Sequence, residues 1–343
     1  MRFLSKGKKG RGQIQPGLLL AVSSIVILLF AGSVKADAAW PASGSGSAIL
    51  IRHNYYSHFE KLLTGTGFHI LRGQTVISSA APYYFTPGGA LYAQEGDGEE
   101  ERDLSALKKE LSSVISGYSG EWSVYVRDLK GGDTIIINDT PMYAASTIKA
   151  FAMAYTYELI AQGRLEKTEE VKKLLTRMIT ISDNTSFNQL VALWYGGDFL
   201  RGARSLNAYL RENGYTETSL HHTIRPASGA HITDGQRNTA SAKDCGLLLE
   251  RIENGTCVNR ACSREMKKLL LDQQRTYKIP ASLPPTAVTA NKTGETTEVQ
   301  HDIAIVSGLK CSYIICVFST TSQSNGINGI KKISRTVWDQ LEQ

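Results

Sequence analysis

The sequence predicts an α+β fold in which a five-stranded antiparallel sheet is flanked by helices and carries an inserted all-helical lobe. Segments that alternate apolar and polar residues lie near both ends of the region from residue 103 onward, two near its start and three near its end. A long stretch with helical spacing separates these two groups. Strands from both ends of such a chain can assemble into one sheet, with helices packed on it and the helical stretch as a lobe between them.

The individual elements follow from local patterns. A helix starts after Asp103, a favourable residue at a helix start, and continues to about residue 118. A Lys-Gly-Gly-Asp turn joins the first two strands into a hairpin. The remaining expected elements are a helical block broken by glycines and short polar loops, three strands and a closing helix: 146–275, 286–294, 300–308, 311–320 and 326–343.

The first 38 residues have the features of a targeting segment. A basic start is followed by the uncharged run GLLLAVSSIVILLFAGSV at 17–34 and by Ala36-Asp37-Ala38, a small-x-small cleavage site. The run is also long enough for a membrane anchor. Residues 1–38 are therefore either a cleaved signal peptide or a retained anchor, and both alternatives place the rest of the chain outside the cytoplasmic membrane, secreted or tethered to its outer face.

The next segment, 39–102, is expected to be a flexible extracytoplasmic linker. It begins with the small and polar run PASGSGS and ends in an acidic run, GDGEEERD, both typical of solvated tethers. The apolar residues between 47 and 63 leave room for a short element that the sequence does not place. The remaining region, 103–343, is expected to be the single catalytic domain.

The net charge of +6 gives no indication of nucleic-acid binding. Residues 1–38 hold six basic groups and one acid, which account for five of the six net positive charges. The basic character of the chain is thus mainly a property of its targeting segment.

Five cysteines in an exported chain leave at least one thiol free. Cys257 and Cys262 could close a small loop, whereas Cys311 and Cys316 lie five residues apart on an expected strand and so face opposite sides. No cysteine has a zinc-like spacing with histidine, and we interpret the five mainly as small buried hydrophobic residues.

The run YAASTIKAFAMAY, 143–155, carries the first chemical signal. Ser146 stands at the expected start of a helix, and Lys149 lies three residues later on the same face. A lysine buried in an apolar helix has a lowered pKa and can serve as the base for a serine nucleophile, but a lysine that reaches solvent is the alternative. The spacing alone is weak, because three other Ser-Lys pairs have it, at 5–8, 105–108 and 307–310.

Two further motifs follow in order. Ser182-Asp183-Asn184 comes after an apolar helix end and opens another helix, which by itself is typical of a helix cap. Lys292-Thr293-Gly294 ends a β-rich run, where glycine indicates close approach of a backbone or a ligand. The three motifs in this order on these elements are far more specific than any one of them.

On these motifs, residues 103–343 resemble the class A β-lactamase and D,D-peptidase superfamily, and the fold implied is β-lactamase/transpeptidase-like. The resemblance implies that Ser146 is acylated, with Lys149 as its base or proton shuttle. Ser182 would relay protons to the leaving nitrogen, and Lys292 would add positive potential. The substrate-binding residues implied are Asn184 for the amide side chain, Thr293 for the carboxylate, and Gly294 and Glu295 on the same strand. The backbone N–H groups of Ser146 and Glu295 would form the oxyanion hole.

The chain departs from the class A pattern in three places. The glutamate–asparagine pair expected on an omega loop is missing, because Thr223 or Ile224 stands where the acid belongs and Glu217 lies too early. His221 and His222 are possible substitutes for that base or ordinary loop histidines. Glu295 has no assigned charge role and could repel a substrate carboxylate or pair with Lys292 or Arg237. The helical block between the first two motifs is also short.

These observations predict an exported serine hydrolase that attacks β-lactams through an acyl-enzyme, with slow deacylation. A D,D-carboxypeptidase or another cell-wall peptide hydrolase is the nearest alternative. A membrane-tethered penicillin-binding sensor without turnover is the alternative from another class. The expected partner is a small β-lactam or a peptidoglycan-like acyl peptide, and we expect a monomer with no cofactor and no metal, since histidines and acids show no ligand spacing.

Overall fold

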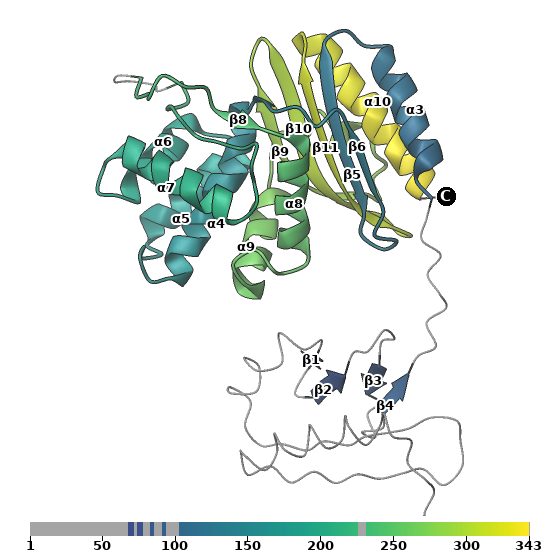
Figure 1. Cartoon of the computed structure of the whole chain (residues 1–343), viewed down its shortest axis with the longest axis horizontal. Coiled ribbons are helices and arrows are strands. Elements are labelled where there is room, and N and C mark those ends of the chain that lie inside the picture. The colour runs from purple at the N-terminus through teal and green to yellow at the C-terminus, as the bar shows by residue number, and fades with distance from the viewer. Residues whose placement is uncertain are drawn as a thin grey trace, which may run out of the picture. The chain divides into compact units, whose positions relative to one another are not determined.

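The computed structural model describes residues 68–71, 74–77, 83–85, 91–93, 103–225 and 231–342. The chain divides into two compact units, 1–99 and 100–343. The second unit contains the five-stranded antiparallel sheet that the sequence predicts, with the strand order β6-β5-β11-β10-β9 (Figure 1). The strands are β5 (Glu121–Asp128), β6 (Thr134–Ile137), β9 (Val288–Glu295), β10 (Val299–Ser307) and β11 (Ser312–Thr320).

The sheet is built from both ends of the domain. β11 pairs with β5, so that Val317 faces Val124, and it pairs on its other side with β10, where Cys316 faces Ile303. β10 in turn pairs with β9, with Ile303 opposite Lys292. This register carries the third motif to the edge of the sheet.

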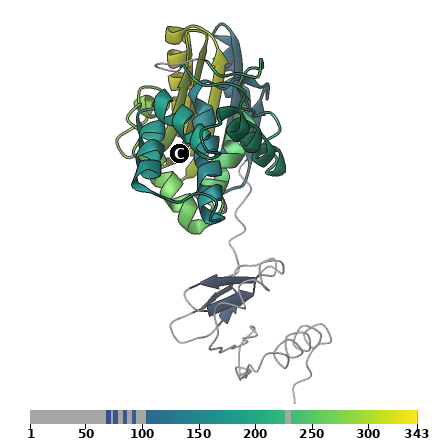
Figure 2. The same cartoon turned by 90° about the vertical axis from the view of Figure 1, so that its left-hand side faces the viewer.

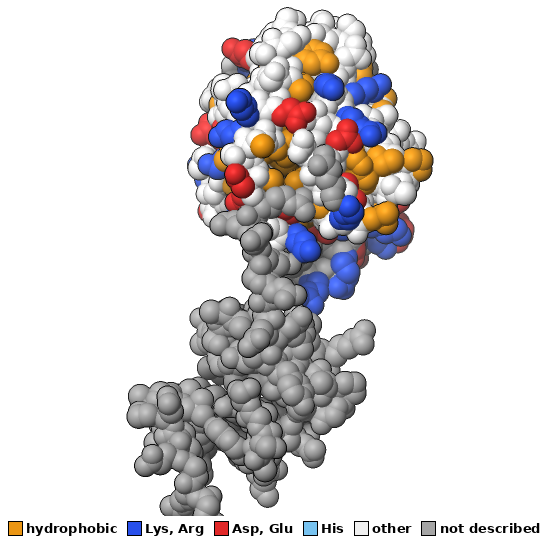
Figure 3. All heavy atoms as spheres, turned by 90° about the vertical axis from the view of Figure 1, so that its right-hand side faces the viewer, with side chains coloured by type: hydrophobic (Ala, Val, Ile, Leu, Met, Phe, Trp, Pro, Cys, Tyr) orange, Lys and Arg blue, Asp and Glu red, His pale blue; other side chains and the backbone are white. Residues whose placement is uncertain are grey.

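Both faces of the sheet are buried. Alternate residues of β5, β10 and β11 therefore enter two different hydrophobic cores, as expected from the period of a strand. One core lies between the sheet and the helices α3 (Ser105–Ser116) and α10 (Gln323–Leu341), which cover one face together (Figure 1). On the surface that these two helices form, basic, acidic and hydrophobic side chains are intermingled (Figure 3).

The second core lies between the other face and the remaining helices. Figure 2 looks onto the helical lobe with the sheet behind it. The predicted helical block is confirmed as a series of separate helices with one short two-stranded pairing. The short pairing joins β7 (Met142–Tyr143), which precedes the block, to β8 (Thr239–Ala240) within it. The helices are η1 (Ala145–Thr147), α4 (Ile148–Ala161), α5 (Glu169–Thr180), α6 (Asn184–Leu193), α7 (Phe199–Glu212), α8 (Ala242–Glu253) and α9 (Arg260–Leu271).

The described residues of the first unit form four short strands in two antiparallel pairs, β1 (Phe68–Leu71) with β2 (Gln74–Ile77) and β3 (Tyr83–Phe85) with β4 (Leu91–Ala93). The sequence predicted no strand here, and the role of 39–102 as a linker remains a prediction. The expected signal or anchor at 1–38 lies outside the described residues. Among the helices that are described, none has the length and apolar character needed to cross a membrane.

All five cysteines are free thiols. The loop closure considered for Cys257 and Cys262 is therefore not formed. Cys245, Cys257, Cys311 and Cys316 are buried, which confirms their interpretation as small core residues, whereas Cys262 is half-buried.

Candidate active site

The first motif lies at the start of the lobe. Ser146 occupies the single turn η1, half-buried, directly before α4. Lys149 lies in the first turn of α4, and its Nζ is 3.0 Å from Ser146 Oγ. The residue before the serine, Ala145, has a φ of 45°. A left-handed conformation is costly for a residue with a side chain and is tolerated where the surrounding structure enforces it, often at functional sites.

Lys149 is fully buried and donates to oxygen atoms only. Besides Ser146 Oγ, its Nζ contacts the Ser182 carbonyl oxygen at 2.7 Å, Ser182 Oγ at 3.3 Å and Asn184 Oδ1 at 2.7 Å. Hydroxyl, carbonyl and amide oxygens satisfy the ammonium protons without neutralising the charge. Burial, together with the positive charge of Arg275, therefore lowers the pKa of Lys149 to about 7. Near neutral pH a large fraction of this amine is unprotonated and able to accept a proton.

The second motif is both a helix cap and part of the site. Asp183 caps α6 by accepting a hydrogen bond from the Ser186 N–H at 2.7 Å, which confirms the capping interpretation. The neighbouring Ser182 has a φ of 59°, which turns its hydroxyl and carbonyl toward Lys149. Asn184 begins α6 and contacts the same amine. The cap thus fixes the turn that presents two groups to Lys149.

The third motif lies on β9, the edge strand of the sheet. Lys292 is fully buried and donates to Ser182 Oγ at 2.9 Å and to the Thr293 carbonyl oxygen at 2.7 Å. Burial holds the pKa of Lys292 well below its usual range, and the charges of Lys149 and Arg275 act in the same direction.

Gly294 lets this strand approach the first motif. A Cβ at Gly294 would lie 2.9 Å from Thr147 Cγ2 and 3.2 Å from the Ala144 carbonyl oxygen. The close approach expected for this glycine is confirmed, and the partner is the backbone and side chain of η1.

The three motifs therefore form one chain of hydrogen bonds. It connects Ser146 Oγ, Lys149 Nζ, Ser182 Oγ and Lys292 Nζ at 3.0, 3.3 and 2.9 Å. Two amines with lowered pKa values on either side of a hydroxyl provide a path along which a proton can move from a serine nucleophile.

The family profile of the beta-lactamase enzyme family matches residues 106–173 and 166–341, which is more than half of the chain. The chain belongs to this family. Membership places it, at the level of the family, among hydrolases that act on cyclic amides. None of the curated proteins compared with the chain matched it.

Solved structures share the fold at low sequence identity. A beta-lactamase from Sphaerobacter thermophilus is 20% identical, with a TM-score of 0.61 over 70% of this chain and 98% of its own. PBP-A is 22% identical, with a TM-score of 0.63 over 70% and 97%. An ancestral (GNCA) class A beta-lactamase is 22% identical, with a TM-score of 0.59 over 68% and 99%. The domain thus has the β-lactamase/transpeptidase fold.

Glu295, the last residue of β9, pairs with neither of the partners considered from the sequence. Its carboxylate contacts Arg275 Nη1 at 2.5 Å, Lys278 Nζ at 3.2 Å and the Tyr277 hydroxyl. Arg237 instead lies over the ring of Tyr143, 5.1 Å from its centroid. The possible pairing of Glu295 with Lys292 or Arg237 is not formed, because the segment after α9 returns beside the end of β9 and supplies Arg275 and Lys278 instead.

The loop expected to carry the deacylating acid contains an isoleucine, Ile224, that is held against α6. The side chain of Asn188 holds the backbone of Ile224 through two hydrogen bonds, each 3.0 Å long, one to its carbonyl oxygen and one from its N–H. Asn188 lies one turn after Asn184 on α6, so Ile224 adjoins the surroundings of Lys149. Ile224 is 7% exposed.

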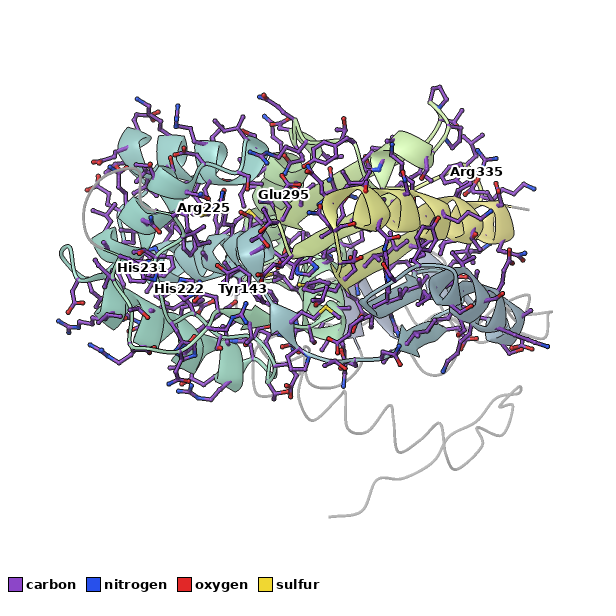
Figure 4. All side chains as sticks on the ribbon, turned by 90° about the horizontal axis from the view of Figure 1, so that it is seen from above. Tyr143, His222, Arg225, His231, Glu295 and Arg335 are labelled. Atoms are coloured by element: carbon purple, nitrogen blue, oxygen red, sulfur yellow. The ribbon has the colours of Figure 1, made fainter. Side chains whose placement is uncertain are left out.

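The two loop histidines make contacts within the loop and with Tyr143. His221 is engaged at both ring nitrogens, with Asp234 at 2.8 Å and Ser219 at 3.0 Å. The ring of His222 stacks on Tyr143 with centroids 5.9 Å apart, and burial lowers its pKa. Figure 4 shows His222 beside Tyr143 and His231. Within 103–225 and 231–342, neither histidine is hydrogen-bonded to Ser146 or Lys149.

Sequence reasoning missed several residues that position the site. These residues are Asn188, Arg275, Lys278 and His301. The buried His301 of β10 contacts the Tyr143 carbonyl oxygen through Nε2 at 2.9 Å, and its Nδ1 accepts from the Ser319 N–H at 3.2 Å. Burial lowers the pKa of His301 to about 3, so the ring is neutral and its Nε2–H donates to the segment before Ser146. The available signal in the sequence was His301, a polar residue within the apolar strand expected at 300–308.

No group of three or more histidine, cysteine or acidic side chains is arranged to hold a metal ion in the parts of the chain that the structure describes. The expectation of a metal-free site stays a prediction.

Proposed function

We propose that the protein is an exported serine hydrolase that attacks β-lactams through an acyl-enzyme on Ser146 and releases the acyl group slowly. The observation that carries this proposal is the contact of 3.0 Å between Ser146 Oγ and Lys149 Nζ, an amine whose pKa is lowered to about 7. A neutral amine at this distance can take the serine proton as the hydroxyl attacks a carbonyl.

The proposed reaction uses each motif in turn. Ser146 Oγ bonds to the lactam carbonyl carbon while its proton passes to Lys149. The carbon–nitrogen bond of the ring then breaks, and the nitrogen takes up a proton delivered through Ser182, which lies between Lys149 and Lys292. The product is an ester between Ser146 and the opened ring. Hydrolysis of that ester requires a water molecule and a base.

Slow release is proposed because the loop lacks the acid that would activate that water. Ile224, the residue held by Asn188, is apolar, and both ring nitrogens of His221 are engaged. Loss of a positioned general base typically costs ~10²–10⁴ in rate. A solved structure of a PBP-A mutant is an acyl-enzyme complex with penicillin G, which supports testing a penicillin first.

Intact-protein mass spectrometry of the chain mixed with benzylpenicillin, followed over time, tests the proposal. The expected result is one persistent adduct that the Ser146→Ala variant does not form. Ser105→Ala is the matched control, because Ser105 has the same spacing to Lys108 but lies exposed on α3, where its hydroxyl bonds Asp103. A short-lived adduct with rapid drug consumption would contradict slow release, and no adduct at all would contradict the β-lactam proposal.

The competing functions are distinguished by repeating this experiment with a second compound, a peptide ending in D-Ala-D-Ala. A D,D-carboxypeptidase would also release D-alanine from a peptide ending in D-Ala-D-Ala. A sensor would hold its adduct without turnover of either compound. Export is proposed from residues 1–38, and the N-terminal mass of the membrane-bound and released protein distinguishes a retained anchor from a cleaved signal.

A further inference from the structure

The carboxylate of Glu295 lies among cations at the end of the strand that carries the third motif. Oε1 accepts from Arg275 Nη1 at 2.5 Å, and Oε2 contacts Lys278 Nζ at 3.2 Å and the Tyr277 hydroxyl. The Lys278 side chain is fully buried, that of Glu295 is 23% exposed and that of Arg275 is 41% exposed. The cluster therefore reaches from the interior to the surface, and Figure 4 shows Glu295 where the strands meet the helical lobe.

This ion cluster adjoins the catalytic lysines. The charge of Arg275 lowers the pKa of both Lys149 and Lys292, after the larger effect of burial, and Glu295 acts on Lys292 in the opposite direction. Lys278 Nζ also donates to the Gly294 carbonyl oxygen at 3.2 Å, which ties the cluster to the backbone of β9. The Glu295 charge is thus part of the electrostatic environment of the site.

The strand also places Glu295 on the side where the substrate is expected. Successive side chains of a strand point to opposite faces, so Glu295 shares its face with Thr293, the residue expected to bind a substrate carboxylate. Arg275 and Lys278 are two cations beside the end of β9 outside the Ser–Lys hydrogen-bond chain, and Glu295 already pairs with both. An incoming carboxylate would meet a like charge and would have to compete for these two partners.

We propose that Glu295 sets the charge preference of the site, by disfavouring acyl donors that carry a carboxylate beside the scissile amide and favouring donors that are neutral or cationic there. This inference rests on the proposed acylation of Ser146. Glu295 acts as a specificity-determining residue through its charge, whereas a purely structural role would consist of holding Arg275 and Lys278 in place.

The pair of variants Glu295→Gln and Glu298→Gln tests this inference. Glutamine keeps the size of the side chain and one acceptor oxygen but removes the charge, and Glu298 is an exposed glutamate three residues further on. The rates of Ser146 acylation are measured by mass spectrometry with benzylpenicillin, which carries the carboxylate, and with its methyl ester, which does not. The quantity compared is the ratio of the penicillin rate to the ester rate.

We expect the ester to react faster with the unmodified protein, and Glu295→Gln to raise the penicillin-to-ester ratio about tenfold, through the penicillin rate. Glu298→Gln should leave the ratio unchanged. Added salt should raise the ratio in the unmodified protein and less so in Glu295→Gln, because screening weakens repulsion. The salt series gives an answer even if Glu295→Gln does not fold.

Three outcomes overturn the inference. A Glu295→Gln variant that slows or speeds both compounds equally shows a structural role only. A ratio that falls shows that Glu295 helps to bind anionic donors. Failure of both compounds to acylate Ser146 in the unmodified protein and in Glu295→Gln contradicts the proposed function itself, and is distinguished from the first two outcomes because no adduct forms at all.

Discussion

Lys149 illustrates how burial at a single residue creates reactivity. Its amine is fully buried but contacts four neutral oxygens from three residues, and the nearest acid that affects it, Asp183, raises its pKa less than burial lowers it. A carboxylate directly bonded to the amine would keep the lysine charged and unable to act as a base. The composition of its surroundings therefore matters as much as the distance to Ser146.

The first prediction concerns pH. If Lys149 accepts the serine proton, acylation by benzylpenicillin should rise about tenfold per pH unit below a pH of about 7 and level off above it. The sign follows because only the unprotonated amine can accept a proton, and lowering the pH protonates it. Lys149→Arg, which stays charged, should lose this dependence together with ~10²–10⁴ of the rate. A rate that is flat across this pH range in the unmodified protein would exclude Lys149 as the base.

A second residue-scale prediction concerns Gly294. A Cβ there would lie 2.9 Å from Thr147 Cγ2 and 3.2 Å from both the Ala144 carbonyl oxygen and the Thr147 nitrogen, so β9 or η1 must shift. Since small displacements of reacting groups are costly, Gly294→Ala should slow acylation by about tenfold or more. The control is Gly117→Ala, at the end of α3, where the nearest contact of an added Cβ is an ordinary 3.4 Å. Acylation of Gly294→Ala at the unmodified rate would show that this close approach is dispensable.

At the scale of elements, the site depends on a loop held by asparagine side chains. Asn207 on α7 holds the backbone of Leu220 through bonds of 2.9 and 2.8 Å, and Asn188 on α6 holds Ile224. Asn238 accepts from the N–H groups of His221 and His222, which lie between them. A short segment thus receives side-chain partners from three other parts of the chain, which satisfies its backbone without regular secondary structure.

These contacts allow the missing acid to be restored. Replacing Ile224 with glutamate places a carboxylate at the position that Asn188 fixes beside α6, so the acyl-enzyme should be released about tenfold faster or more. Because Ile224 is buried, the new carboxylate has a raised pKa, and the gain should stay below that of a fully ionised base. The measurement is the decay of the Ser146 adduct by mass spectrometry.

Ile224→Gln is the matched control for this change, since it alters size and polarity without adding a base. Its adduct should persist as long as that of the unmodified protein. If the glutamate and glutamine variants lose their adducts at the same rate, disruption of the loop, and not base catalysis, explains the effect.

The same elements show what the sequence could and could not predict. The strand and helix patterns are local properties, so the five-stranded sheet and the helical lobe were predictable from them. The meeting of Ser146, Lys149, Ser182 and Lys292 was instead implied by the family resemblance that the three ordered motifs carry. The left-handed conformation of Ala145 and the pairing of Glu295 with Arg275 depend on contacts across tens of residues. Neither feature can be predicted from the neighbouring residues, because the same local sequence is compatible with many different tertiary contacts.

At the scale of the whole molecule, the site lies where the edge of the sheet meets the start of the lobe. β9 is an edge strand, and η1 packs against it through the close approach at Gly294. An uncovered edge is open to unwanted pairing, and covering it with another element prevents this. Here the covering element carries Ser146, so protection of the edge and assembly of the three motifs rely on the same contact.

The last prediction is that residues 103–343 fold and react without the preceding segment. Among the described residues, both hydrophobic cores consist of residues between Leu104 and Leu341, so the fragment 103–343 keeps every one of these core residues. The fragment and the longer chain should therefore unfold within about 2–4 °C of each other, the shift that 1 kcal/mol produces in a domain of this size. Their rates of acylation by benzylpenicillin should agree.

A fragment that begins at residue 119 provides the contrast. It lacks α3, whose Leu107 and Leu111 are 3% and 0% exposed, and so loses one wall of the core shared with α10. Burial of each such leucine contributes roughly 1.5–3 kcal/mol, so the shorter fragment should unfold at a much lower temperature or fail to fold. Were the 103–343 fragment to behave like the shorter one, residues before 103 would have to contribute to the folded domain, and the boundary at 103 would be wrong.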